Sequence, residues 1–174
     1  MKSLKASFRR RQAGFTLIEV LVAVALMGII SLGAAVSSGQ LLNQTSHDRD
    51  YTLASHNTAN ALNWIGRDAL MAQQITGWQG FPATTPLTLT WTTWDNTVYT
   101  ANYTMSGATL IRTYTGGSGI SRIVIADGIS ADPAKTYCTS NSTTLTFTIT
   151  SSIGEGSKVI DVTRTRSIVC RPKL

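Results

Sequence analysis

The residues best suited to specific chemistry lie near the amino terminus, where one carboxylate interrupts an apolar run. Glu19 is the only charged residue between Phe15 and Val36. A carboxylate at the centre of a membrane-spanning helix costs about 2.5–3.5 kcal/mol, and less near an end. Pairing with a positive charge makes such a group tolerable. The position of Glu19 therefore predicts a cationic partner from outside its own segment.

Cleavage of the chain just before the apolar run would create that partner. Three interpretations fit the composition: a signal anchor, a secretory signal peptide cut near residues 33–35, and a cut between Gly14 and Phe15. Only the third gives Phe15 a charged amine, which on a neighbouring copy could pair with Glu19. The first two leave the carboxylate without a partner, so the residues favour the third.

The segment that carries these residues has the length of a membrane helix. Residues 15–36 would form a helix about 33 Å long, against a hydrocarbon core of about 30 Å. Residues 1–14 hold five Lys and Arg and no acid, whereas the rest holds ten basic and nine acidic residues. The positive-inside rule then predicts a cytoplasmic N-terminus, a single crossing and a domain outside the cytoplasm. The basic pI reflects the leader and does not indicate nucleic-acid binding.

Residues 13–23, AGFTLIEVLVA, resemble the N-terminal motif of type IV prepilins and type II secretion pseudopilins. In that family a basic leader ends in glycine, the mature chain begins with phenylalanine, and a glutamate follows. The resemblance implies that prepilin peptidase cleaves after Gly14, that Phe15 is N-methylated and that Glu19 neutralises a neighbouring Phe15 during subunit assembly. It also implies other pilin or pseudopilin subunits as partners, in an inner-membrane protein that assembles into a periplasmic or cell-surface filament.

Beyond the apolar run, the periodicity predicts an α+β, pilin-like fold. One face recurs at three- and four-residue spacing through Leu62, Ile65, Ala69 and Ala72, so a helix is expected over residues 15–76 with Gly77 as its stop. After Gly77 the period becomes two, which predicts an antiparallel β-sheet packed on the helix. The expected division is a removed leader, a membrane or filament-core helix, its amphipathic continuation and a β domain, at residues 1–14, 15–36, 37–76 and 77–174. Strands are expected at residues 87–91, 98–105, 109–114, 120–126, 144–150 and 159–169.

A second stretch is similar to J-like minor pseudopilins and W-type minor pilins. Residues 103–112, YTMSGATLIR, followed by residues 123–129, IVIADGI, match their pattern of tyrosine, strand, turn, Leu-x-Arg and further strand. Many major pilins also carry a kinking proline where this chain has Val36. The resemblance implies a minor subunit and leaves open whether it serves a secretion pseudopilus, a pilus or a competence filament.

The two cysteines, Cys138 and Cys170, show no metal-binding spacing. If this part of the chain lies outside the cytoplasm, a disulfide is the favoured interpretation, and it would stabilise the fold by about 3–4 kcal/mol. Two buried free thiols are the alternative. The pair also resembles the disulfide-bounded C-terminal region of type IV pilins.

No other group of residues predicts a catalytic, metal or cofactor site. His47 and His56 lie nine residues apart, which does not place them on adjacent turns of one helix face. Arg164 and Arg166 share one strand face and are candidates for phosphate contact, but a solvated strand face next to the chain terminus is the favoured interpretation. We therefore expect a structural subunit without cofactors and no nucleic-acid partner. The competing interpretation is a membrane-anchored extracytoplasmic binding module, DNA-binding if it belongs to a competence-type filament. Oxygens for a calcium ion could come from Asp127, Asp132, Asn141 and Glu155, but their spacing matches no calcium loop. The four tryptophans are expected to make core or filament contacts rather than a ligand platform: Trp64, Trp78, Trp91 and Trp94.

Overall fold

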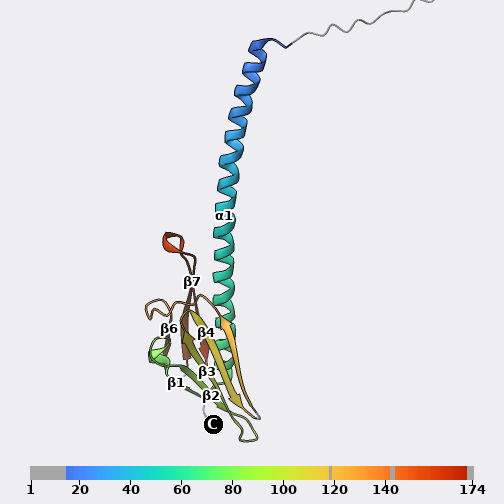
Figure 1. Cartoon of the computed structure of the whole chain (residues 1–174). Coiled ribbons are helices and arrows are strands. Elements are labelled where there is room, and N and C mark those ends of the chain that lie inside the picture. Colours follow the sequence, from blue (N-terminus) through green and yellow to red (C-terminus); the bar gives the residue numbers. More distant parts are fainter. Residues whose placement is uncertain (1–14, 118, 142–143, 172–174) are drawn as a thin grey trace, which may run out of the picture. The chain divides into compact units, whose positions relative to one another are not determined.

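The computed structural model describes residues 15–117, 119–141 and 144–171 (Figure 1). The predicted leader, with Gly14 on which the predicted cleavage depends, lies outside the described residues. The chain divides into two units, residues 1–45 and residues 46–174, and each is described by itself. One helix, α1, begins in the first unit at Leu17 and ends in the second at Met71.

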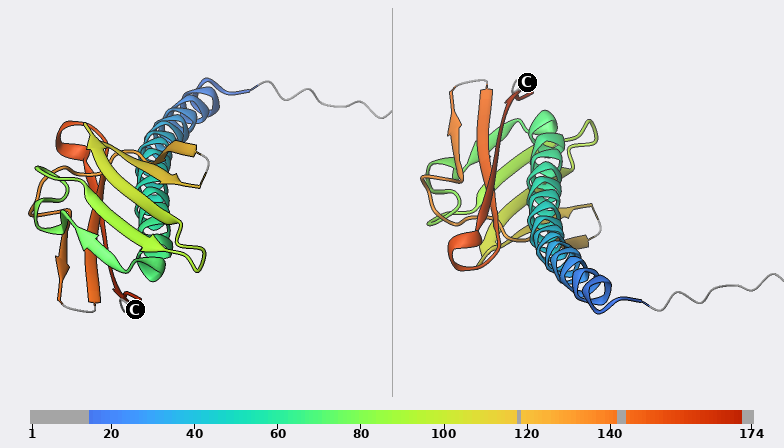
Figure 2. Two further views of the ribbon diagram at one scale, coloured as in Figure 1. Left: turned by 90° about the horizontal axis from the view of Figure 1, so that it is seen from below. Right: turned by 90° about the horizontal axis from the view of Figure 1, so that it is seen from above.

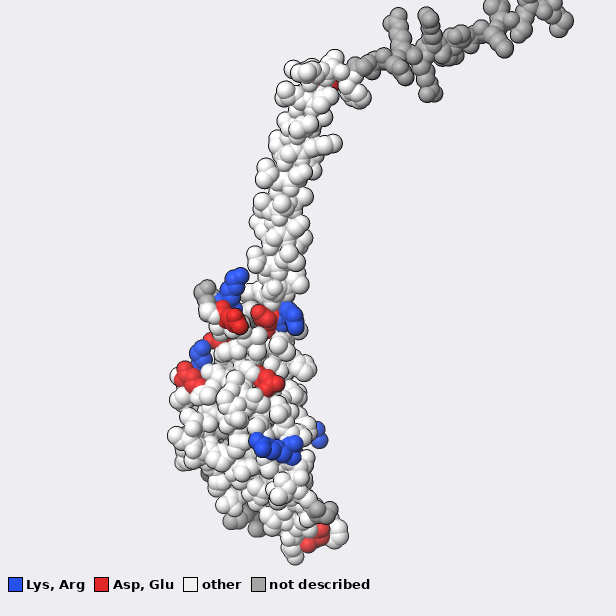
Figure 3. Space-filling model, in the orientation of Figure 1, with Lys and Arg blue, Asp and Glu red and all other residues white. Residues whose placement is uncertain are grey.

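The first unit consists, in its described part, of the apolar portion of α1. Its large side chains are all exposed, from Phe15 at 87% to Leu42 at 72%. In Figure 3 this length of helix is almost entirely white, since Glu19 is the only charged residue within residues 15–46. A helix that exposes apolar side chains on all sides is typical of a segment that packs in lipid or against other chains.

The second unit packs the rest of α1 against two antiparallel sheets. The first sheet has the order β1-β2-β3-β4-β5, and the second has the order β6-β7-β8. The strands of the first sheet are β1 (Gln74–Thr76), β2 (Leu87–Thr92), β3 (Val98–Ser106), β4 (Thr109–Gly116) and β5 (Gly119–Ala126). Those of the second are β6 (Tyr137–Ser140), β7 (Thr144–Ile153) and β8 (Ile160–Val169), and two short 3-10 turns are η1 (Trp78–Gly80) and η2 (Gly156–Lys158).

The core of this unit lies between α1 and the inner faces of both sheets, as the two views of Figure 2 show. The predicted helix face is buried, with Ile65 and Ala69 at 0% exposure. The inward residues of the strands are buried as well, which agrees with their period of two: Leu87, Leu89, Ala101, Tyr103, Leu145, Phe147 and Ile149 are all at 0%. The predicted α+β class, with a long helix packed on an antiparallel β domain, is confirmed.

Side chains of α1 also reach the backbone of the strands that end each sheet. The Thr58 hydroxyl lies 3.2 Å from the carbonyl oxygen of Val162 in β8. The Asn60 amide donates to the carbonyl of Ile125 in β5. These two contacts tie α1 to an edge strand of each sheet.

The structure differs from the sequence prediction at three places. The helix ends at Met71 rather than near residue 76, because residues 74–76 instead pair with Thr88–Thr90 of β2. The four-residue strand β6 was not predicted, since it is too short to show an alternating pattern. The β domain contains two sheets rather than one, with β6, β7 and β8 forming the second.

Candidate functional site

Glu19 forms a capping box at the start of α1. Its Oε2 atom accepts a hydrogen bond from the Thr16 backbone N–H at 3.0 Å and another from the Thr16 hydroxyl at 2.9 Å. In return, the Glu19 N–H lies 3.4 Å from the Thr16 hydroxyl oxygen. A threonine at the N-cap followed by glutamate three residues later is the sequence signature of this motif. The carboxylate is thus held in position by its own chain.

One oxygen of this carboxylate is left over. Both bonds from Thr16 reach Oε2, and within the described part of the chain nothing donates to Oε1. Phe15, the residue that would carry the new amine, lies just ahead of the helix and is 87% exposed. Glu19 and Phe15 are thus both exposed at the start of α1. Whether the chain is cut at Gly14 stays a prediction.

The helix that follows Glu19 is long and apolar enough to cross a membrane. Among the described residues, α1 alone meets that test, with a window of mean hydropathy 2.4 that is 0% buried. This property rests on length and composition. It agrees with the predicted membrane or filament-core segment over residues 15–36.

The two cysteines are free thiols in the structure. Cys138 on β6 is opposite Phe147, which in turn is opposite Arg166 on β8. Cys170 follows Val169, which lies about 10 Å further along β8 and two strands away from Cys138. A disulfide requires Cα atoms within about 7 Å. The predicted bridge would therefore need the chain end to rearrange, and the pairing stays a prediction about that rearranged state.

The most constrained polar group of the second unit was not predicted from sequence as a site. Asp68 on α1 accepts hydrogen bonds from Arg112 on β4, at 2.7 Å from Nε to Oδ2 and 3.0 Å from Nη2 to Oδ1. The hydroxyl of Tyr103 on β3 also donates to Asp68 Oδ2. All three residues are buried, at 7%, 8% and 0% exposure respectively. We call Asp68, Arg112 and Tyr103 the helix–sheet clamp.

Two aromatic rings complete the surroundings of the clamp. The Arg112 guanidinium lies 5.0 Å from the centre of the Trp64 ring and 4.7 Å from that of Tyr114. A delocalised cation over aromatic faces is favourable, so the guanidinium is stabilised on the sides that Asp68 does not reach. The clamp thus ties α1 to β3 and β4 through both charge and packing.

The protonation chemistry of the clamp indicates a structural role. Burial, followed by the negative charge of Asp68, raises the pKa of Tyr103 well above its usual value. Burial lowers the pKa of Arg112, but the hydrogen bond and charge of Asp68 outweigh it and the net shift is upward. Neither group can exchange a proton near neutral pH, which general acid–base catalysis requires.

The structure places the two arginines considered for phosphate contact against α1. Arg164 Nη2 donates to the Ser55 hydroxyl at 2.7 Å, and Arg166 Nη1 lies 3.4 Å from Asn63 Oδ1. They project from the same face of β8, opposite Ile149 and Phe147 in register. The two guanidinium groups are therefore fixed by neutral partners on the helix.

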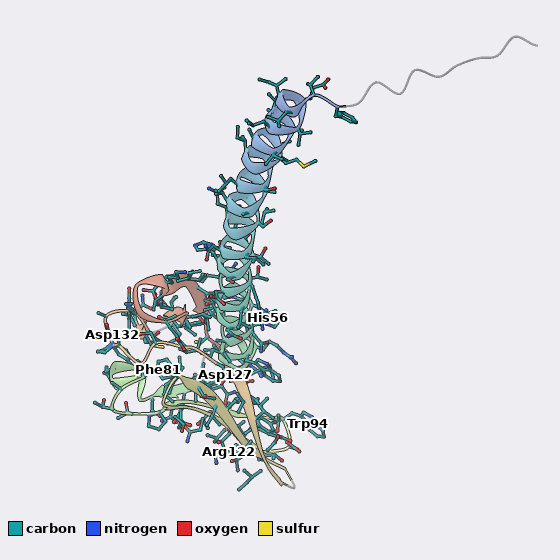
Figure 4. All side chains as sticks on the ribbon, turned by 45° about the horizontal axis from the view of Figure 1, so that its top comes forward. His56, Phe81, Trp94, Arg122, Asp127 and Asp132 are labelled. Carbon is teal, nitrogen blue, oxygen red and sulfur yellow. The ribbon has the colours of Figure 1, made fainter. Side chains whose placement is uncertain are left out.

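The remaining candidates do not converge on a site. No group of three metal-ligating side chains occurs within the described ranges. In Figure 4, His56, Asp127 and Asp132 lie apart from one another on the domain. Trp91 is buried and Trp64 and Trp78 pack against the core, whereas Trp94, in the turn between β2 and β3, is 96% exposed. Of the expected core or filament contacts, Trp94 therefore lies outside the core of this domain, and a filament contact stays a prediction for it.

Comparison with known proteins adds one finding. The family described as the prokaryotic N-terminal methylation motif matches residues 9–35. The matched segment contains the Gly14–Phe15 junction, Thr16 and Glu19, so the resemblance of this segment to type IV prepilins is confirmed. Neither a curated protein nor a solved structure matches the chain.

Proposed function

From the prokaryotic N-terminal methylation motif that residues 9–35 carry, we propose that the chain is a structural subunit of a type IV pilus-like filament or type II secretion pseudopilus. Prepilin peptidase cleaves after Gly14, and Phe15 is then N-methylated. The observation that carries the proposal is Glu19: a carboxylate in the first turn of the apolar helix, four residues after Phe15, with one oxygen to which no described residue donates.

The residues support a defined assembly step. Cleavage leaves a cationic amine on Phe15, and in an apolar environment both that amine and a carboxylate need a partner of opposite charge. Glu19 keeps Oε2 on Thr16 and offers Oε1 to the amine of a neighbouring copy. The hydrogen bonds of the capping box satisfy Oε2 of the carboxylate. The subunit can therefore remain stable in the membrane before it assembles.

The same segment supports an orientation and a division of labour. The five basic residues of the leader stay on the cytoplasmic side of the inner membrane, and the domain after the helix lies outside the cytoplasm. Residues 15–36 form the spanning and filament-core helix, residues 37–71 continue it, and the two sheets form the exposed domain. No step of this role calls for a catalytic residue or a cofactor.

We further propose that the chain is a minor subunit. The pattern from Tyr103 to Arg112 that resembles J-like pseudopilins and W-type pilins has a physical basis here, since both residues bind Asp68. Tyr103 and Arg112, at the two ends of the pattern, hold α1 onto the first sheet. The pattern is therefore expected in any chain whose helix packs on its sheet in the same way. The resemblance supports a place near a filament tip, in a secretion, pilus or competence machine.

The test separates charge pairing from helix capping. Glu19→Gln retains the amide oxygen that a capping box needs, but it has no charge. Glu19→Val removes both functions. If the carboxylate serves a neighbouring amine, both variants remain in the membrane fraction and both are lost from sheared filaments by about tenfold or more. Incorporation of Glu19→Gln at the level of the unmodified chain would show that capping suffices, and incorporation of Glu19→Val would overturn the proposal.

A further inference from the structure

A groove lies between α1 and β8 of the folded unit and carries charged side chains. Its volume is about 430 Å³, and its lining comes from Ala59, Leu62 and Asn63 of the helix and from Arg164, Thr165 and Arg166 of the strand. Ala59 and the largely buried Leu62 contribute apolar surface to the lining, and the two arginines contribute charge. The groove therefore combines apolar surface with two positive charges.

The Arg166 guanidinium packs against Gly66, a glycine within α1. A Cβ atom at Gly66 would lie 3.0 Å from Arg166 Nη1 and 3.0 Å from Ile168 Cδ1, so the missing side chain makes room for the guanidinium. Glycine within a helix costs about 1 kcal/mol relative to alanine. This space and the contact to Asn63 together restrain the Arg166 guanidinium.

Arg164 is restrained in the same way at the other end of the groove, by Ser55. The ion pairs found among the described residues join Arg112 to Asp68, Lys135 to Asp161 and His47 to Asp48. Neither Arg164 nor Arg166 takes part in one. Each guanidinium has five N–H donors, of which the contacts to the helix use one. Most of the N–H donors of Arg164 and Arg166 therefore remain available to bind an anion.

We propose that this groove, which we call the α1–β8 groove, binds an acidic amphipathic helix of a partner protein. Ser55 and Asn63, which restrain the two arginines, are eight residues apart on α1 and therefore about 12 Å apart along its axis. Two glutamates seven residues apart on a partner helix span about 10.5 Å on one face and match that separation. Leucines between them would cover Ala59 and Leu62.

The surroundings favour a protein over a nucleic acid. Binding to a phosphate backbone draws its affinity from several Lys and Arg contacts at once. The chain after the leader carries ten basic and nine acidic residues, so it lacks a broad positive field. The apolar surface of Ala59 and Leu62 beside two restrained arginines is instead suited to a partner with paired carboxylates and hydrophobic side chains. The hydrophobic contact would then add to the charge-assisted hydrogen bonds.

The experiment uses the full chain in detergent micelles, with ¹⁵N-labelled arginine side chains observed by NMR. The probe is a synthetic helical peptide with two glutamates seven residues apart and two leucines between them. Shifts of the Arg164 and Arg166 Nε–Hε signals, and an affinity about tenfold weaker in Arg164→Gln or Arg166→Gln, are expected, because each variant removes one charge-assisted pair. Arg122→Gln on β5 is the matched control, and its affinity should be unchanged.

Gly66→Ala gives a second variant with a different signature. The added Cβ displaces Arg166 and should weaken peptide binding severalfold, while its gain in helix propensity opposes its crowding of Ile168, so the thermal stability is measured alongside. The proposal is overturned if the peptide does not bind, if a glutamine version of it binds equally well, or if Arg122→Gln weakens binding as much as Arg164→Gln. It is also overturned if a short DNA duplex binds more tightly than the peptide with the same dependence on both arginines.

Discussion

Asp68 of α1 and Arg112 of β4 form a buried two-point ion pair across 44 positions of sequence, with contacts of 2.7 Å and 3.0 Å. Both side chains are only 10% exposed. The pair leaves neither charge uncompensated, because Tyr103 donates a further bond to Asp68 and two aromatic rings cover Arg112. It fixes where the helix crosses the first sheet.

Breaking this pair on one side should be far more damaging than replacing it. Asp68→Ala leaves a buried guanidinium without a partner, and we expect it to lower the free energy of unfolding by about 3–5 kcal/mol. The double variant Asp68→Leu/Arg112→Met removes both charges and should cost much less. Denaturant unfolding of the detergent-solubilised chain measures both. A single variant no less stable than the double variant would contradict the clamp.

Tyr103→Phe tests the third member of the clamp with little change of shape. It removes the hydroxyl that donates to Asp68 and keeps the buried ring. Because a hydrogen bond to a charged group is worth about 1.5–3 kcal/mol, the free energy of unfolding should fall by that amount. The loss should largely disappear in a chain that already lacks Asp68, and equal losses in both backgrounds would show that the hydroxyl acts elsewhere.

Thr58 should contribute to stability through the edge of β8. Its hydroxyl lies 2.8 Å from the Ala54 carbonyl and 3.2 Å from that of Val162, and the residue is fully buried. Thr58→Val keeps the shape and removes the buried hydroxyl contact, while the Ala54 carbonyl keeps its helical N–H donor, so about 0.5–1.5 kcal/mol of stability should be lost. Thr52→Val is the matched control, since its hydroxyl makes the same bond to Asp48 on an exposed turn. A similar loss in both variants would exclude a role for the strand edge.

The buried thiol of Cys138 should make the reduced protein sensitive to alkali. Burial raises its pKa from the usual 9.0 to about 12. The folded state thus holds the thiol proton more tightly than the unfolded state. The stability that Cys138 contributes in this way is fully present below pH 9, and it is lost as the pH rises from 9 to about 12. The free energy of unfolding should fall by about 1.4 kcal/mol per pH unit above pH 9. Cys138→Val should remove this slope just above pH 9, and an unchanged slope would assign the effect to other groups.

The two thiols should also differ in reactivity. The thiolate is the reactive form, and burial suppresses it more at Cys138 than at the half-buried Cys170. In the reduced protein at mildly alkaline pH, iodoacetamide should therefore modify Cys170 well before Cys138, as read by peptide mass spectrometry. Equal rates would contradict the buried position of β6. In protein prepared without reductant, protection of both residues until a reductant is added would demonstrate the predicted disulfide.

Much of the fold could be predicted because single residues repeat with a clear period. Ile65 and Ala69 mark the buried face of α1, and Leu145, Phe147 and Ile149 mark the inner face of β7. These patterns depend only on burial against some other element. They do not specify which element, so the separation into two sheets did not follow from them.

The clamp could be recognised only in part. Tyr103 and Arg112 were noted through a family resemblance, but an aspartate such as Asp68 on a predicted helix has the appearance of a solvated residue. Its role depends on a contact 44 positions away, which no local pattern encodes. Glu19 was the opposite case, because a charge inside an apolar run conflicts with its surroundings in the sequence itself.

The account depends most on the start of the mature chain. Intact-mass measurement of the protein from membranes that contain prepilin peptidase tests this directly. We predict a chain that begins at Phe15 and is heavier by one methyl group, and a full-length chain when Gly14 is replaced by a bulky residue. A mature chain that begins at any other residue, or one that keeps its leader in the presence of the peptidase, would contradict the account.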